Sequence, residues 1–577
     1  MLKRLIRQLV GAGVPADSPA QASTPEAVVS MSRALTLMRA RDYDAAVQMC
    51  QDLIARDAAA PGPWELLGAI ALERGEKELA RVRFETALTL AGDQPTPLCN
   101  AAEANRQAGR HARALELSAR ALALDPDNGA AMYNQALTLQ SCWRAEEALA
   151  VYRRLLGLRP ELSQAYAGYL FLLLLLGEDP LALRAAHCRW AAINAEPLRE
   201  TGTGHGYARD PLRRLRIGYV SADFRDHAAS SFVEPILSAH DRAGFETHCY
   251  SSTETSDAVT ARLRSTVSCW REVRWQDDAA LANLIRADGI DILVDLSGHT
   301  NGNRLAAFAR KPAPVQVTYL GYTATTGMSA MDYRISDARL DPPGAADGYY
   351  TETLLRLPHS LWCFRPPASM PAPGPLPASQ SGQITFGSLN SMLKLRPATI
   401  ALWSRLLLSI PRSRLIIASV EAGEASLRIA AEFARHGVPA DALSFRAPLA
   451  RAQFWALSGE IDIALDSFPC NGGATTCETL WLGLPVLSLA GELFQSRAGL
   501  SLLSVIGLPE LVAQSESDYL RIARELASDR ERLAQLRRGL RQRMRASPLL
   551  DETGFTRSLE ALYREAWRCW CETGPHA

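Results

Sequence analysis

The chain has 577 residues, enough for about three or four domains of roughly 150 residues each. Hydrophobic residues make up 47% and charged residues 21%, which is typical of globular proteins. The 62 Lys and Arg balance the 62 Asp and Glu, so no global positive field indicates nucleic-acid binding, and no apolar run is long enough for a membrane span.

The amino-terminal segment, residues 1–29, begins with basic residues, but Arg7 and Gln8 interrupt its apolar stretch, so we do not expect a secretory signal. The 11 cysteines are scattered without CxxC spacing, which favours reduced thiols over a disulfide framework or a zinc site. We therefore predict a cytoplasmic protein.

Residues 30–200 carry an internal repeat with a period of 34 residues. Alanines, glycines and prolines recur at this spacing: Ala46, Ala80, Ala114, Ala148, Ala182, Gly75, Gly109, Gly177, Pro126 and Pro160. One copy has the W…LG…A…F…A pattern of a tetratricopeptide repeat, at Trp64, Leu67, Gly68, Ala80, Phe84 and Ala87. We predict an α/α superhelix of about five helix pairs, with degenerate copies at its ends.

From residue 213 to 365 the pattern changes to short apolar runs rich in β-branched residues, with helical stretches such as Asp278–Arg286 between them. The runs are Arg216–Phe224, Asp291–Gly298 and Val315–Tyr322. They indicate buried parallel strands of a doubly wound, Rossmann-like half. The proline-rich segment 366–382 that follows is predicted to be an exposed linker.

Residues 383–548 carry a second alternating set. Its predicted strands are Ile384–Leu389, Arg414–Ser419, Ala442–Phe445, Ile461–Asp466 and Leu484–Leu489. The basic run Arg530–Arg545 is interleaved with leucines and is predicted to be a solvated helix face, and residues 549–572 form a carboxyl-terminal helix with a wide apolar face. Two α/β halves joined by a linker leave a cleft, where ligands bind at the carboxyl ends of the strands.

Polar and glycine-rich segments follow the predicted strands of the first half. His227, beside Asp223 and Asp226, could act as a general base, or could be an ordinary loop histidine near a helix start. His299 lies between glycines that allow close backbone approach, although a plain turn accounts for it equally well. Gly321, in the segment LGYTATTG, could line the same cleft.

In the second half, Lys394 precedes a predicted helix start, where its ammonium could reach a bound diphosphate or could simply face solvent. The segment FPCNGGATTCETLW follows the run Ile461–Asp466. Its Gly472 and Gly473 allow a tight turn, and Thr475 and Thr476 would add N–H groups and hydroxyls at a helix amino terminus, an arrangement that favours anions. An ordinary connection between a strand and a helix accounts for the segment equally well. No Walker motif is present, because no Gly-Lys-Thr follows the glycines.

These segments occur in a fixed order after a repeat array: SADFRDH, SGHTNGNR, RKPAPVQVTYLGYTATTG, NSMLK and CNGGATTCETLWLGLPV. This order resembles the O-linked N-acetylglucosamine transferase and SPINDLY-like family, the family-41 glycosyltransferases, in a bacterial form with few repeats. The resemblance extends from about Ser30 to Trp570. It implies a GT-B fold and inverting, metal-independent transfer of N-acetylglucosamine from UDP-N-acetylglucosamine to Ser or Thr hydroxyls, with no further cofactor.

The resemblance also implies roles for individual residues. His227 corresponds to the active-site histidine discussed as a base, Lys394 to the lysine that stabilises the leaving diphosphate, and Glu478 to the ribose-binding acid. Phe454 is our assignment for the ring that stacks on uracil. The remaining predicted donor-site residues are Gly472, Gly473, Thr475, Thr476, Asn390, Ser391, Gly321 and His299. Protein or peptide acceptors are expected along the repeat superhelix.

The chain departs from the animal members of the family at four positions in these segments. Gly473, Ala474, Glu478 and Ser391 stand where those enzymes have His, Thr, Asp and Gln. The run TTCE is closer to the SPINDLY branch. Transfer of another sugar such as glucose or fucose is therefore an alternative, as is a repeat scaffold with an inactive transferase half.

Overall fold

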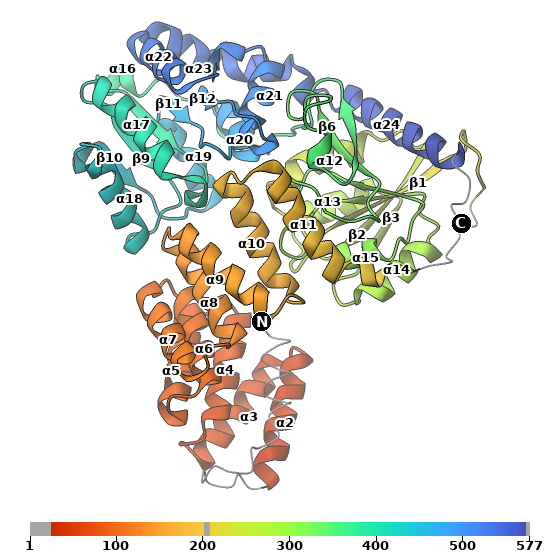
Figure 1. Ribbon diagram of the computed structural model, residues 1–577, viewed down its shortest axis with the longest axis vertical. Helices are drawn as coiled ribbons and strands as arrows, with labels where there is room; N and C mark the ends of the chain where they lie inside the picture. The colour runs from red at the N-terminus through yellow and green to blue at the C-terminus, as the bar shows by residue number, and fades with distance from the viewer. Residues whose placement is uncertain (1–24, 201–207, 573–577) are drawn as a thin grey trace. The chain divides into compact units, whose positions relative to one another are not determined.

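The computed structural model describes residues 25–200 and 208–572 (Figure 1). The chain divides into two compact units, Met1–Arg159 and Pro160–Ala577. The predictions for residues 1–24 lie outside the described residues, and the first described helix begins at Pro25, earlier than the predicted repeat boundary at residue 30.

The first unit contains helix pairs of the predicted tetratricopeptide type. Its described helices are α2 (Pro25–Arg39), α3 (Tyr43–Arg56), α4 (Pro61–Glu73), α5 (Lys77–Ala91), α6 (Pro95–Gln107), α7 (His111–Leu124), α8 (Gly129–Ser141) and α9 (Ala145–Leu158). Four of the 34-residue alanines are fully buried where the helices cross: Ala46, Ala80, Ala114 and Ala148. Small side chains at these positions let neighbouring helices approach closely.

The turn inside each helix pair also repeats. Arg41, Gly75, Gly109, Trp143 and Gly177 have φ angles between 57° and 75° at the same point of successive copies. Glycine adopts this left-handed conformation at no steric cost, which accounts for the periodic glycines in three of the five copies.

The last helix pair of the predicted repeat region belongs to the second unit. It comprises α10 (Ser163–Leu176) and α11 (Pro180–Asn194). The 34-residue pattern predicts a buried alanine at position 182, but Ala182 is exposed. Helix α11 instead buries a face that includes Leu183, His187 and Trp190. That face packs on the α/β part of the unit: the His187 Nε2 and the Tyr322 hydroxyl are 2.9 Å apart.

The first α/β lobe contains a parallel sheet with the strand order β3-β2-β1-β4-β5-β6-β7 among the described residues. The strands are β1 (Leu215–Ser221), β2 (Phe245–Ser251), β3 (Cys269–Glu272), β4 (Ile292–Asp295), β5 (Val315–Thr318), β6 (Tyr333–Asp337) and β7 (Thr353–Leu357). The helices between them are α12 (Ser230–Ala239), α13 (Ala258–Thr266), α14 (Asp278–Ala287) and α15 (Leu305–Ala309). The strand order reverses between β1 and β4, so the loops that follow these two strands flank a crevice at the carboxyl edge of the sheet.

The second lobe repeats this topology, with the order β10-β9-β8-β11-β12-β13. Its strands are β8 (Thr385–Ser388), β9 (Arg414–Ile417), β10 (Leu443–Phe445), β11 (Ile463–Leu465), β12 (Val486–Leu489) and β13 (Val512–Ala513). Its helices include η3 (Met392–Lys394), α17 (Pro397–Ser409), α18 (Glu424–Arg435), α19 (Arg451–Ala456), α20 (Ala474–Trp481), η6 (Phe494–Ser496), α21 (Ala498–Val505), α22 (Glu516–Ser528) and α23 (Arg530–Arg545). The reversal lies between β8 and β11 and brings the loops after these strands together.

Two sequence predictions for this lobe need correction. The proline-rich segment is not simply exposed, because Met370, Leu376 and Ala378 are buried. The basic helix α23 is not wholly solvated either: Arg537 is buried and donates hydrogen bonds to the carbonyls of Gly374 and Ile461 at 2.8 and 3.0 Å. A charged side chain can be buried here because backbone carbonyls accept its N–H groups.

The carboxyl-terminal helix α24 (Glu552–Glu572) matches the predicted helix and lies along the first lobe (Figure 1). Glu560 contacts His240 Nδ1 at 3.0 Å, and Trp567 donates to the Asp210 carbonyl at 3.0 Å. The chain thus returns to its first lobe after completing the second. Among the described residues, none of the helices has the length and apolar character required to cross a bilayer.

Replacement of Gly68 by alanine should destabilise the protein. A Cβ at this position of α4 would lie 2.7 Å from the ring of Phe84, so about 1–3 kcal/mol of overpacking outweighs the gain of about 1 kcal/mol in helix propensity. Gly157→Ala, in α9, is the matched control, because no atom lies within 4 Å of its added Cβ. Thermal unfolding should show a lower midpoint for Gly68→Ala only. Equal midpoints for the two variants would contradict the packing.

Candidate functional site

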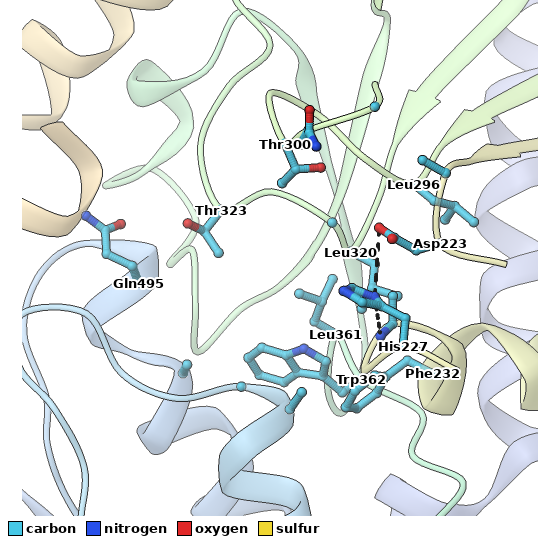
Figure 2. Close-up of a pocket in the computed structure, with 18 of the residues that line it drawn as sticks. Asp223, His227, Phe232, Leu296, Thr300, Leu320, Thr323, Leu361, Trp362 and Gln495 are labelled. Atoms are coloured by element: carbon cyan, nitrogen blue, oxygen red, sulfur yellow. Dashed lines mark hydrogen bonds and ion pairs between the residues drawn. The ribbon is translucent and has the colours of Figure 1, made fainter. Parts of the chain in front are cut away.

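A cavity of about 680 Å³ opens at the carboxyl edges of the two sheets. The loops after β1, β4, β8 and β11 all contribute to it, as the two reversals of strand order require. Polar and aromatic residues in its lining include Asp223, His227, Thr300, Trp362, Lys394, Asn471 and Gln495. Figure 2 shows His227 with Trp362 beside it and Gln495 on the opposite side of the cavity.

His227 lies between the end of β1 and the start of α12, and its side chain is partly exposed to the cavity. Burial lowers the pKa of its imidazole, and the nearby Asp223 carboxylate opposes this effect. The backbone N–H of Ala229 donates to Nδ1 at 3.3 Å, which favours the neutral ring that carries its proton on Nε2. A further proton would be taken up at Nδ1, which lies 3.8 Å from the Asp223 carboxylate.

Lys394 lies in the loop after β8 and reaches residues 469–473, which contain Gly472 and Gly473 and are called the glycine turn below. It ends the short helix η3, whose amino terminus is capped by the Ser391 hydroxyl, and its Nζ donates to the Asn471 carbonyl at 2.7 Å. The two residues are 77 positions apart in the sequence. An ammonium has three donors, so the bond to the Asn471 carbonyl does not use all of them.

The glycine turn is organised by a buried carboxylate, Asp466, at the end of β11. Its oxygens accept hydrogen bonds from Gly472 N, Asn390 Nδ2 and Ser488 Oγ at 2.7, 2.9 and 2.9 Å. Burial raises its pKa to about 6, although these hydrogen bonds and the nearby Lys394 act in the opposite direction. Asn390 therefore contacts Asp466 and is not among the residues that line the cavity, and its role in donor binding stays a prediction.

Helix α20 begins at this turn with its amino terminus at the cavity. Gly473 and Ala474 line the cavity, and no side chain caps the first turn of the helix. Gly472 has no room for a side chain, because a Cβ would lie 2.6 Å from the Thr476 hydroxyl. That hydroxyl donates to the Gly472 carbonyl at 3.0 Å, whereas Thr475 is partly exposed. Uncapped N–H groups at a helix start favour an anion.

Glu478 is buried one turn into α20 and is already paired. Arg451 donates to its Oε1 at 2.6 Å, and Trp455 Nε1 donates to its Oε2 at 3.0 Å. Arg451 also forms an ion pair with Asp226 of the first lobe, next to His227. Phe454 lies on the same helix, α19, is half-buried and does not line the cavity.

The structure separates His299 from the other predicted site residues. His299 is buried, its Nε2 lies 2.9 Å from the Thr326 carbonyl, and its ring packs on Trp190 with the centroids 4.4 Å apart. Burial lowers its pKa to about 4, so the ring is neutral. His299 therefore joins the last helix pair to the first lobe. Gly321 does line the cavity, where a Cβ would lie 2.0 Å from the Leu296 carbonyl.

Four residues that shape the site were not predicted. Asp466 ends a predicted strand, and a carboxylate at the end of a buried apolar run is a signal that could have identified it. Trp362, Gln495 and Arg451 lie in segments without a motif, so no local pattern distinguishes them. Among the described residues, no group of three or more His, Cys, Asp or Glu side chains is arranged to hold a metal ion.

The sequence profile of glycosyl transferase family 41 matches residues 203–364 and 376–559, which are most of both lobes. Among solved structures, a mutant of the O-GlcNAc transferase of Thermobaculum terrenum is similar to this chain, with 38% identity and a TM-score of 0.83. The similarity covers 90% of this chain and 99% of that one. The predicted combination of helical repeats with a GT-B fold is thereby confirmed.

Curated relatives match a little over three-fifths of this chain. The Petunia hybrida protein named "Probable UDP-N-acetylglucosamine--peptide N-acetylglucosaminyltransferase SPINDLY" is 39% identical over 376 residues, or 63% of this chain. The Caenorhabditis elegans "UDP-N-acetylglucosamine--peptide N-acetylglucosaminyltransferase" is 24% identical over 482 residues, or 62% of this chain. The matched regions span 40% and 41% of those relatives' own lengths.

The wild-type protein should lose stability relative to an Asp466→Asn variant as the pH rises. The folded-state pKa of about 6 lies above the ordinary aspartate value, so ionisation costs more in the folded than in the unfolded protein. The relative loss should develop between about pH 4 and pH 7 and reach on the order of 3 kcal/mol. The amide of the variant does not titrate, and its oxygen can still accept from Gly472 N and Asn390 Nδ2 while its NH₂ group donates to the Ser488 hydroxyl.

The measurement is the thermal midpoint of both proteins across this pH range, with the exposed Asp441→Asn as a control for the loss of one carboxyl group. A constant difference between wild type and Asp466→Asn would contradict the raised pKa of Asp466.

Proposed function

The chain belongs to glycosyl transferase family 41, and on that premise we propose that it transfers N-acetylglucosamine from UDP-N-acetylglucosamine to Ser or Thr hydroxyls of proteins. The observation that carries the proposal is the meeting of Lys394, the glycine turn and the uncapped start of α20 in one cavity. The printed names of the relatives support this donor and a peptide acceptor.

The leaving diphosphate gathers negative charge as its bond to the anomeric carbon breaks. Lys394 can bind a diphosphate oxygen while it still donates to the Asn471 carbonyl, and the N–H groups at the start of α20 face the same space. Fixed positive groups placed where charge develops stabilise the transition state. This chain needs no further cofactor if these groups suffice. The role of Glu478 as the ribose acceptor stays a prediction, because Arg451 and Trp455 already donate to its two oxygens.

The acceptor hydroxyl attacks the opposite face of the sugar, so that its oxygen bonds to the anomeric carbon and UDP leaves with the electron pair. Its proton passes to His227 Nδ1 or to a phosphate oxygen of the donor. The Asp223 carboxylate, 3.8 Å from Nδ1, would stabilise the resulting imidazolium.

The helix pairs are the part of the chain that we expect to bind the acceptor protein. A superhelix of such pairs presents a concave surface on which an extended polypeptide can bind. We infer that acceptor proteins bind along it and that the reaction takes place in the cytoplasm. That the protein is a bacterial member of the family stays a prediction.

A different donor sugar is the second candidate, because the chain departs from the animal enzymes of the family at Gly473, Ala474 and Glu478 of the predicted donor site. The chain is 39% identical to the Petunia hybrida protein and 24% identical to the Caenorhabditis elegans protein. Calorimetric titration with UDP-N-acetylglucosamine, UDP-glucose and GDP-fucose, followed by mass spectrometry of acceptor proteins, separates the candidates. A mass increase by one N-acetylhexosamine supports the first. Binding of none of the donors would indicate a scaffold with an inactive transferase half.

Lys394→Ala should lower kcat by roughly a hundredfold or more, because the leaving group loses its cation. Initial-rate measurement of UDP release tests this, with Lys77→Ala on the exposed start of α5 as the control. The thermal midpoint of both variants reports on folding. Near-normal turnover of a folded Lys394→Ala variant would remove Lys394 from the mechanism.

The pH profile of kcat/KM should fall on the acid side at a pKa below 6.5. Only the neutral His227 can take a proton, and burial lowers the pKa of its ring, so activity is lost as the pH falls through that lowered value. His227→Asn should lose most activity together with this acid limb. His436→Asn, at the exposed end of α18, is the control. An acid limb that persists in His227→Asn would assign it to another group.

A further inference from the structure

The end of helix α10 lies against the loops that form the proposed donor site. Gly177 follows α10 in the left-handed conformation, with a φ of 72°. A Cβ at this glycine would lie 2.8 Å from the Pro469 side chain, at the start of the glycine turn. Helix α10 also lies against η3, which carries Lys394.

A chain of hydrogen bonds leads from α10 to the lysine. The Leu174 carbonyl, in the last turn of α10, accepts from Gln495 Nε2 at 3.4 Å. The Gln495 carbonyl accepts from the backbone N–H of Asn471 at 2.7 Å, and the Asn471 carbonyl accepts from Lys394 Nζ at 2.7 Å. Gln495 is buried, and Gln495, Asn471 and Lys394 all line the cavity where the donor would bind.

From this geometry we propose that the end of α10 positions the donor site, with Gly177 as a positioning residue that sets the place of the Pro469–Gly473 loop and, through Asn471, of Lys394. The last helix pair then positions residues of the donor site, in addition to any contribution to acceptor binding. This inference rests on the proposed function, because it assigns Lys394 to the leaving diphosphate.

The repeat itself provides matched controls. Gly75 and Gly109 occupy the same point of earlier copies, with φ angles of 75° and 74°, but no atom lies within 4 Å of a Cβ added to either. Alanine at any of the three positions carries the same left-handed backbone strain. Only alanine at position 177 also displaces Pro469.

The test compares Gly177→Ala with Gly75→Ala and Gly109→Ala in the full chain. We expect Gly177→Ala to lower kcat for hydrolysis of UDP-N-acetylglucosamine without added acceptor by on the order of ten- to hundredfold, since a displacement of about 1 Å has effects of this size. The two controls should keep the wild-type kcat. Thermal midpoints separate loss of activity from loss of folding.

Hydrogen exchange of the backbone amides in residues 467–476 provides a readout that does not depend on turnover. Exchange should be faster in Gly177→Ala than in wild type and unchanged in both controls. If Gly177→Ala does not fold, Gly177→Asn with Gly75→Asn and Gly109→Asn replaces it, because asparagine tolerates the left-handed conformation and still adds the Cβ.

The outcomes separate the two proposals. A wild type that neither binds nor cleaves the donor would overturn the proposed function, and hydrogen exchange would still decide whether α10 positions the loop. An active wild type, with Gly177→Ala equal to the two controls in both kcat and exchange, would overturn the positioning role alone.

Discussion

The buried carboxylate of Asp466 is the group on which the arrangement of the second lobe's cavity loops depends. Its two oxygens accept hydrogen bonds from the turn after β11, from Asn390 in the loop after β8 and from Ser488 on β12. An unpaired charge at this depth would be costly, so the three donors must stay in place while Asp466 is ionised. Because one of them is the N–H of Gly472, this requirement also fixes where α20 begins.

The fold explains why residues so far apart in sequence meet around the cavity. In each lobe the strand order reverses beside the first strand, between β1 and β4 and between β8 and β11. The loops after these four strands carry His227, Thr300, Lys394 and the glycine turn. Arg451 then joins the two sides, since it pairs both with Glu478 of the second lobe and with Asp226 of the first. The last helix pair contacts the loops of the second lobe through Gly177 and Leu174.

Local patterns were sufficient to predict much of the fold. Apolar, β-branched runs identified β1, β4 and β5 and most strands of the second lobe, and the 34-residue period identified the helix pairs. The strands β2 and β6 were not predicted, because they contain polar residues such as His248 and Arg334 that are buried only in the folded protein. Arg334 donates to the carbonyls of Ala324 and Tyr322, partners that no periodicity can indicate.

The candidate site was predictable where a motif follows a strand, and not where partners come from remote segments. His299 has the surroundings of a ligand-binding histidine in sequence, yet Trp190 and His187 of α11 bury it. Asn390 likewise turns toward Asp466, 76 residues further along the chain. The contacts of Gly177 could not be predicted either, because its partner Pro469 is remote in sequence. In the repeat pattern, Gly177 is equivalent to Gly75 and Gly109.

A crystal structure of the protein with UDP bound tests the roles of Lys394 and α20 most directly. We expect diphosphate oxygens within hydrogen-bond distance of Lys394 Nζ and of the backbone N–H groups at the start of α20, with the Asn471 carbonyl still accepting from Lys394. A nucleotide bound elsewhere, or a diphosphate that contacts neither Lys394 nor α20, would contradict both roles.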